Sequence, residues 1–172
     1  MDIQPDPAKI DFLLLCDHAE VANGKLTAMG IGWDTIQQPF APRIPGMAAM
    51  RPPPIRMAVG LGFSVGWNFT NQPIPLEVVL EDSEGKPLFK VAAQLTAGRA
   101  PNQPVGTPVR SVLAFPLLIT FPTSGRYRVL ASLPQHGSHM EWGFTVLPPP
   151  EPPQITFASP SALLPLTPPA TP

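Results

Sequence analysis

The chain has 172 residues, of which 44% are hydrophobic, and its 11 basic and 12 acidic side chains leave a net charge of −1. This length predicts one domain with its own core rather than two. The near-neutral charge and the scattered Lys and Arg argue against the basic stripe that binding to nucleic acid requires. The charged fraction is 13%, about half of the roughly 25% of ordinary soluble proteins, and this favours association with protein.

Cys16 is the only cysteine, so the chain cannot form an internal disulfide. The fold is therefore expected to depend on its core, and a reducing, cytoplasmic location is predicted. No stretch reaches the roughly 18 apolar residues needed to cross a bilayer, so no direct insertion into a membrane is expected.

Residues 1–9 are expected to be a flexible lead into a domain over 10–147. The first strand is predicted from Ile10 to Val21. Asn23-Gly24 follows it and is typical of a type I′ hairpin turn, because both residues tolerate positive φ. A strand over 25–34 should return antiparallel to the first.

A long ordered loop is predicted for Pro39 to Pro54, a stretch with six prolines and no hydrophobic period. This loop is a candidate contact for a partner.

The segment from Met57 to Phe69 alternates without a break between large apolar residues and small ones. Alternation of this kind predicts a strand whose large side chains fill a core. Its other side is expected to be a surface where another backbone or a flat partner comes close, because glycine in a strand packs nothing itself. The candidate partner-binding residues on that side are Ala58, Gly60, Gly62 and Gly66.

Further short strands follow, separated by turn residues and lacking any helical period. Asp82 to Gly85 predicts the turn of a second hairpin, and Pro116 places its strand at a sheet edge or a bulge. About eight strands at near-regular spacing predict an all-β fold, an antiparallel β-sandwich, with a barrel as the alternative. The later strands are expected over 76–81, 88–95, 109–121, 126–133 and 139–146.

The composition changes after Leu147, since ten of the final 25 residues are proline. Residues 148–172 are therefore predicted to be an extended or disordered Pro-rich tail. Apolar side chains in such a tail are candidate docking points for a protein partner, and the alternative is a flexible linker with incidental hydrophobes. These residues are Ile155, Phe157, Leu163, Leu164 and Leu166.

Three segments, FLLLCDHAEVANGKLTAMGIGWD, EDSEGKPL and FPTSGRYRVLASLPQHGSHMEWGFTV, resemble in this order a family of small bacterial proteins known only as a domain of unknown function. The resemblance covers about residues 10–147. It implies an immunoglobulin-like or similar sandwich and brings no reaction, cofactor or catalytic residue with it. The Gly125-x-Tyr127 piece is typical of sandwiches in which a tyrosine at a strand corner bonds back to the backbone.

No phosphate loop, nucleophile elbow, zinc-protease motif or dinucleotide fingerprint is present in the sequence. Asp17 and His18 are neighbours in a strand and point to opposite faces, while His136 and His139 provide too few ligands for a closed zinc site. No catalytic residue, metal or cofactor is therefore predicted.

The predicted function is that of a non-catalytic binding or structural subunit that associates with another protein or with its own copies. A carbohydrate-binding or other small-ligand module is the alternative, because exposed tryptophans stack on sugar rings. However, Trp33, Trp67 and Trp142 all fall on the large apolar registers, which predicts burial in the core. An enzyme is the third possibility.

Overall fold

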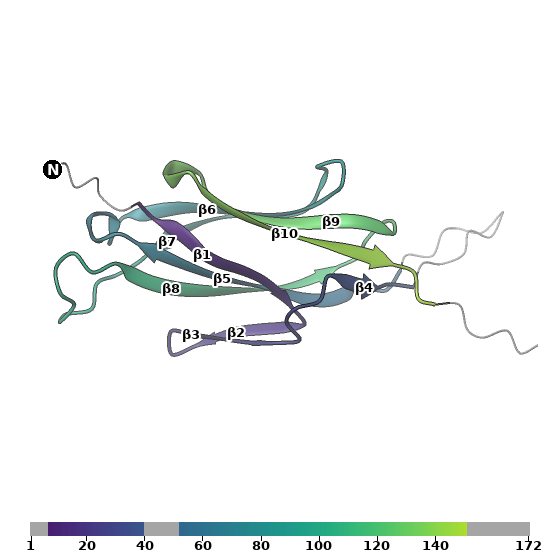
Figure 1. Ribbon diagram of the computed structural model, residues 1–172, viewed down its shortest axis with the longest axis horizontal. Coiled ribbons are helices and arrows are strands. Elements are labelled where there is room, and N and C mark those ends of the chain that lie inside the picture. Colours follow the sequence, from purple (N-terminus) through teal and green to yellow (C-terminus); the bar gives the residue numbers. More distant parts are fainter. Residues whose placement is uncertain (1–6, 40–51, 151–172) are drawn as a thin grey trace, which may run out of the picture.

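The computed structural model describes residues 7–39 and 52–150, and it confirms the all-β sandwich (Figure 1). One sheet has three strands in the order β1-β5-β8, and the other has five in the order β4-β10-β9-β6-β7. A separate two-stranded hairpin, β2-β3, lies against the outer side of the smaller sheet. The strands are β1 (Lys9–Cys16), β2 (His18–Ala22), β3 (Lys25–Met29), β4 (Thr35–Gln37), β5 (Ile55–Val65), β6 (Pro73–Asp82), β7 (Pro87–Thr96), β8 (Val109–Ile119), β9 (Gly125–Leu133) and β10 (Ser138–Leu147).

The core lies between the two sheets and is filled by the large residues of each alternating strand. In β5 the odd-numbered side chains from Met57 to Val65 are completely or almost completely buried, and they meet the alternate residues of β6, β9 and β10. At one end of the core, Phe121, Tyr127 and Phe144 form an aromatic cluster with ring centroids 4.7–6.0 Å apart. The Tyr127 hydroxyl donates to the Thr123 carbonyl at 2.8 Å, which confirms the predicted tyrosine corner.

A buried glutamine ties the two sheets together at this end. The Gln38 side chain donates from Nε2 to the Phe121 carbonyl at 2.8 Å and accepts from the Phe121 N–H at 3.1 Å. Its own backbone N–H donates to the Leu147 carbonyl at 2.9 Å. Gln38 therefore holds the end of β10 close to Phe121, two residues beyond the end of β8.

The predicted strand from Ile10 to Val21 is two strands, because the chain bends at Asp17. β1 pairs with β5 before the bend, and β2 pairs with β3 after it. The Asn23-Gly24 turn is confirmed, with φ of 50° and 70°. The predicted return strand to Asp34 is too long, since β3 ends at Met29 and positive φ at Gly30 and Gly32 turns the chain away from the ladder.

The predicted strand to Phe69 is also too long, because β5 ends at Val65 and residues Trp67–Phe69 form a 3₁₀ helix, η1. A second 3₁₀ turn, η2, covers Pro134–His136. β8 lies at the edge of its sheet as Pro116 predicts. Most of the expected loop between Pro39 and Pro54 lies outside the described residues.

Candidate functional site

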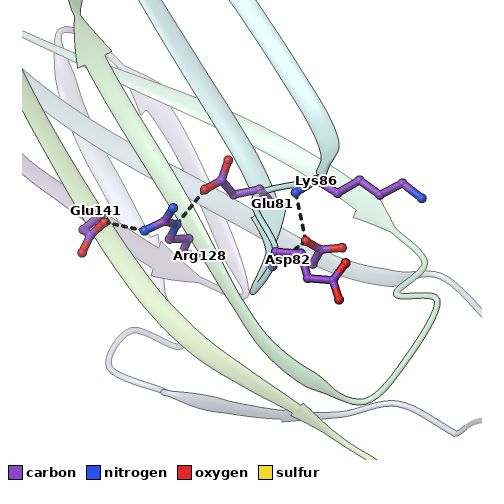
Figure 2. Close-up of polar contacts among 6 residues, drawn as sticks. Glu81, Asp82, Lys86, Arg128 and Glu141 are labelled. Atoms are coloured by element: carbon purple, nitrogen blue, oxygen red, sulfur yellow. Dashed lines mark hydrogen bonds and ion pairs between the residues drawn. The ribbon is translucent and has the colours of Figure 1, made fainter.

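The two sheets present outer faces of opposite character. The outer face of the five-stranded sheet carries paired charges: Arg128 Nε lies 2.7 Å from Glu81 Oε1 and its Nη1 lies 3.5 Å from Glu141 Oε2 (Figure 2). Lys90 Nζ lies 3.3 Å from Glu77 Oε2 on the same face. The Glu81 side chain is only 13% exposed, but the other members of these pairs are 40–60% exposed. Ion pairs at a surface contribute little stability, and such a face is an ordinary solvated surface.

The outer face of the three-stranded sheet is built from small and apolar residues. From β5 it receives Ala58, Gly60, Gly62 and Ser64, which the register sets beside the even-numbered residues of β8. The β2-β3 hairpin lies over β5 and β8 on this side. We use the name hairpin face for the hairpin together with the sheet surface that it covers.

The predicted small-residue surface is therefore buried, and the side chains that fill the space above it belong to the same chain. Ala58, Gly60 and Gly62 are all buried. A Cβ placed on Gly60 would lie 2.6 Å from Leu14 Cδ1 and 3.0 Å from Leu26 Cδ2, and one on Gly62 would overlap the ring of Phe12. The glycines leave room for these side chains, so they are not an exposed contact surface in this structure.

Gly66 is buried too, but it does not share this face. It lies beyond the end of β5 at the start of η1, because the strand stops at Val65. The tail candidates Ile155, Phe157, Leu163, Leu164 and Leu166 lie outside the described residues.

A second, small core lies beneath the hairpin. It consists of Cys16, Ala19 and Ala58, with Leu14, Leu26, Ala28 and Ala114 packed around them. Cys16 Sγ is 3.5 Å from the Ala58 carbonyl, to which it donates. Burial, with a smaller contribution from the negative charge of Asp17, raises the pKa of the Cys16 thiol. The thiol is therefore protonated at neutral pH, which makes it a packing group rather than a nucleophile.

The hairpin covers its sheet incompletely. Phe12, Val21, Met29, Ile31 and Leu118 have exposed fractions between 36% and 65%, and Leu118 is the most exposed of the five. All five lie on the hairpin, just after it, or on the sheet face that it covers. Beside them is a cavity of about 300 Å³ lined by Asp17, His18, Arg56, Met57, Pro116 and Leu118, among others. The hairpin face therefore presents apolar surface with a charged rim.

Strand β8 carries a sequence that is unusual for its position. Residues 112–119, VLAFPLLI, are uncharged and apolar on both sides of the strand, a composition typical of a central strand. Yet β5 is the only strand of the described segments that is hydrogen-bonded to β8. Natural edges are usually protected by charges, bulges or proline, and here Pro116 is the main such device. We call residues 112–119 the apolar edge.

Pro116 placed this strand at a sheet edge or a bulge, but the sequence did not single out residues 112–119 as a contact surface. The signal was present as eight consecutive apolar residues within 109–121, but a run of this kind reads equally well as a buried strand. Only the strand order shows that one side of it has no described partner.

The tryptophans do not form a platform of stacked, exposed rings. Trp33 and Trp142 are partly buried against the core, as predicted. Trp67 lies on η1, where the Arg99 guanidinium sits 4.0 Å from its ring centroid. Arg99 also donates to the Trp67 carbonyl at 2.7 Å, so it is held in place over that ring.

A cavity of about 490 Å³ lies at the end of the sandwich where β1 begins. It is lined by Pro7, Phe69, Gln72, Pro73, Ile74 and His136, together with Gln135. His136 accepts from the Ala8 N–H at 3.4 Å and meets the Phe69 ring edge-on. Among the described residues of this lining, no carboxylate, thiol or hydroxyl accompanies the imidazole, so they do not resemble an acid–base or nucleophilic site.

Comparison with protein families gives one match. The model of a family of unknown function (DUF6941) matches residues 11–136, which is most of the chain. The chain belongs to this family. No curated protein matches it. The matched range includes β1 from its third residue, the whole hairpin, the whole of β8, and the tyrosine corner of this DUF6941 sandwich.

Two features of the described residues concern metal binding and membrane crossing. Residues 7–39 and 52–150 contain no group of three or more His, Cys, Asp or Glu placed to hold a metal ion. Within the same residues, no helix has the length and apolar character needed to cross a membrane.

Proposed function

We propose that this DUF6941 protein is a non-catalytic binding subunit that associates with protein through the apolar edge and the adjoining hairpin face. The observation that carries the proposal is the apolar edge itself: eight uncharged residues on a strand with one unpaired side in the described structure. An extended segment added there would gain main-chain hydrogen bonds from the strand and specificity from the alternating side chains.

The charge distribution also favours the side of the molecule that carries the apolar edge as the binding side. The opposite sheet bears Arg128, Lys90 and their acidic partners on its outer face, and removing such charges from water is costly. Burying Leu118, which is 65% exposed, instead gains free energy in proportion to its apolar area.

A carbohydrate-binding function receives less support. A sugar ring stacks on the open face of an aromatic side chain, but the Trp67 face is occupied by Arg99, and Trp33 meets Phe144 edge-on inside the sandwich. The buried, unpaired thiol of Cys16 supports a reducing, cytoplasmic location as part of the proposal.

Site-specific photocrosslinking tests this function. The photoreactive residue p-benzoyl-phenylalanine is introduced at Leu118 on the hairpin face, and at Glu141 on the polar face as the matched exposed control. We expect irradiation in cells to yield an adduct of defined mass joining two polypeptides from position 118 only, with the second polypeptide identified from its peptides. Absence of that adduct, or equal adducts from both positions, would contradict the proposal.

A further inference from the structure

The other sheet edges of the described structure differ from the apolar edge. β4 has only three residues, and β7 carries Lys90, which pairs with Glu77 of its neighbour. The start of β1 is held by β10 and η2, since the N–H of Ile10 donates to Ser138 Oγ at 2.9 Å and that of Ala8 to His136. β8 is thus the edge with the least protection against pairing with another strand.

The chain leaves the sandwich near the end of β8, at the level of the residue that follows the strand by two positions. Gln38 bonds both the Leu147 carbonyl, where β10 ends, and the Phe121 carbonyl, just after β8. In Figure 1, β10 ends beside β4. β8 runs toward this end of the sandwich, because its last residue, Ile119, lies two residues before Phe121. A segment that starts here and runs back along β8 would be antiparallel to it.

The sequence after Leu147 provides a segment suited to that path. Residues 148–153, PPPEPP, favour a polyproline II spacer, which at about 3.1 Å per residue reaches about 19 Å. Residues 154–159, QITFAS, are free of proline, so each has an N–H to donate, and β-branched and aromatic side chains are frequent among them. Ile155 and Phe157 are two residues apart and would share one face of a strand.

We propose that residues 154–159 add to the apolar edge of the same molecule, as an antiparallel fourth strand of the β1-β5-β8 sheet. This inference rests on the proposed function, because it assigns an occupant to the same edge. A protein partner would then bind by displacing the chain's own segment, and the edge would be protected from uncontrolled pairing until that partner is present.

Hydrogen exchange of the full chain tests the inference. Thr156→Pro removes a donor in the middle of the proposed strand, and Ser161→Pro, just outside it, is the matched control. We expect the amides of residues 112–118 to exchange at least about tenfold faster in Thr156→Pro than in the parent chain or in Ser161→Pro. Equal exchange in all three proteins, whether fast or slow, would overturn the inference.

Two further measurements define the arrangement. A synthetic peptide of residues 152–161 added to Thr156→Pro should restore slow exchange in 112–118, and failure to do so would count against strand addition at this edge. Light scattering of the parent chain should show a monomer, and hydrogen exchange of the same sample should show slow exchange in β8. A dimer whose β8 protection disappears on dilution would overturn the arrangement within one molecule.

The outcome of crosslinking at Leu118 separates this inference from the proposed function. An adduct between two polypeptides together with equal exchange in the three proteins would retain the binding function and reject the chain's own segment as the occupant. Loss of β8 protection in Thr156→Pro without any intermolecular adduct would retain the segment and reject the partner.

Discussion

At the scale of single residues, Cys16 shows how burial determines chemistry. Its side chain has no exposed surface, and its Sγ lies against the Ala58 carbonyl. The same burial that excludes reagents also raises the pKa of the thiol. The single cysteine of the sequence is therefore part of the packing beneath the hairpin.

The raised pKa of Cys16 predicts a loss of stability at alkaline pH. The folded thiol holds its proton to higher pH than the unfolded one, so its contribution to stability is complete below the unfolded pKa and is lost as pH rises through the folded pKa. We expect the free energy of unfolding to fall more steeply above about pH 9 in the parent chain than in Cys16→Ala. Urea denaturation between pH 7 and 10.5 measures both proteins, and parallel curves would contradict the expectation.

At the scale of elements, the hairpin and the strand beneath it depend on each other. β2 and β3 form only one two-stranded ladder, and an isolated hairpin is marginal in water. The hairpin gains stability by laying Ala19, Leu26 and Ala28 on the small residues of β5 and β8. Gly60 matters here because its missing side chain makes space for Leu14 and Leu26.

We expect Gly60→Val to destabilise the protein by about 1–3 kcal/mol, because the added side chain overlaps Leu14 and Leu26. Faster hydrogen exchange should be concentrated in β2 and β3, which the larger residue displaces. Gly143→Val is the control, since a Cβ at Gly143 on the polar face meets only the Tyr127 carbonyl at 3.9 Å. Equal denaturation midpoints for the two variants would show that the hairpin tolerates a side chain at position 60.

At the scale of the whole molecule, Gln38 connects parts of the chain that lie 83 residues apart. Its amide satisfies both the N–H and the carbonyl of Phe121 in a fully buried position. Leaving buried backbone groups without partners costs the full desolvation penalty.

We therefore expect Gln38→Ala to lower the free energy of unfolding by about 2–3 kcal/mol, measured by chemical denaturation. Its neighbour Gln37 is exposed on β4, so Gln37→Ala is the matched control and should change stability by less than about 0.5 kcal/mol. A similar small change in both variants would mean that water or local rearrangement replaces the Gln38 bonds.

The sequence by itself determined the class of fold and most of its strands. Alternation from Met57 to Val65, the Asn23-Gly24 turn and the Gly125-x-Tyr127 corner depend on local backbone preferences, so a single sequence is enough to show them. The strands predicted over 10–21, 25–34 and 57–69 were too long, because local breaks at Asp17, Gly30 and Gly66 interrupt their ladders. The small-residue face was expected to meet another backbone or a flat partner, but in the structure it is covered by side chains of β1 and of the hairpin of the same chain.

Only the tertiary structure decided which apolar surfaces are covered and which remain open. That the small face of β5 lies beneath Leu14 and Leu26 and that Gln38 reaches Phe121 depend on contacts between distant residues. Pro116 predicted an edge or a bulge for β8, and only the strand order shows that it is an edge. Hydrophobic pattern fixes which side of a strand avoids water, whereas strand order fixes what lies next to it. For this reason the apolar run of β8 has a functional meaning only in the folded molecule.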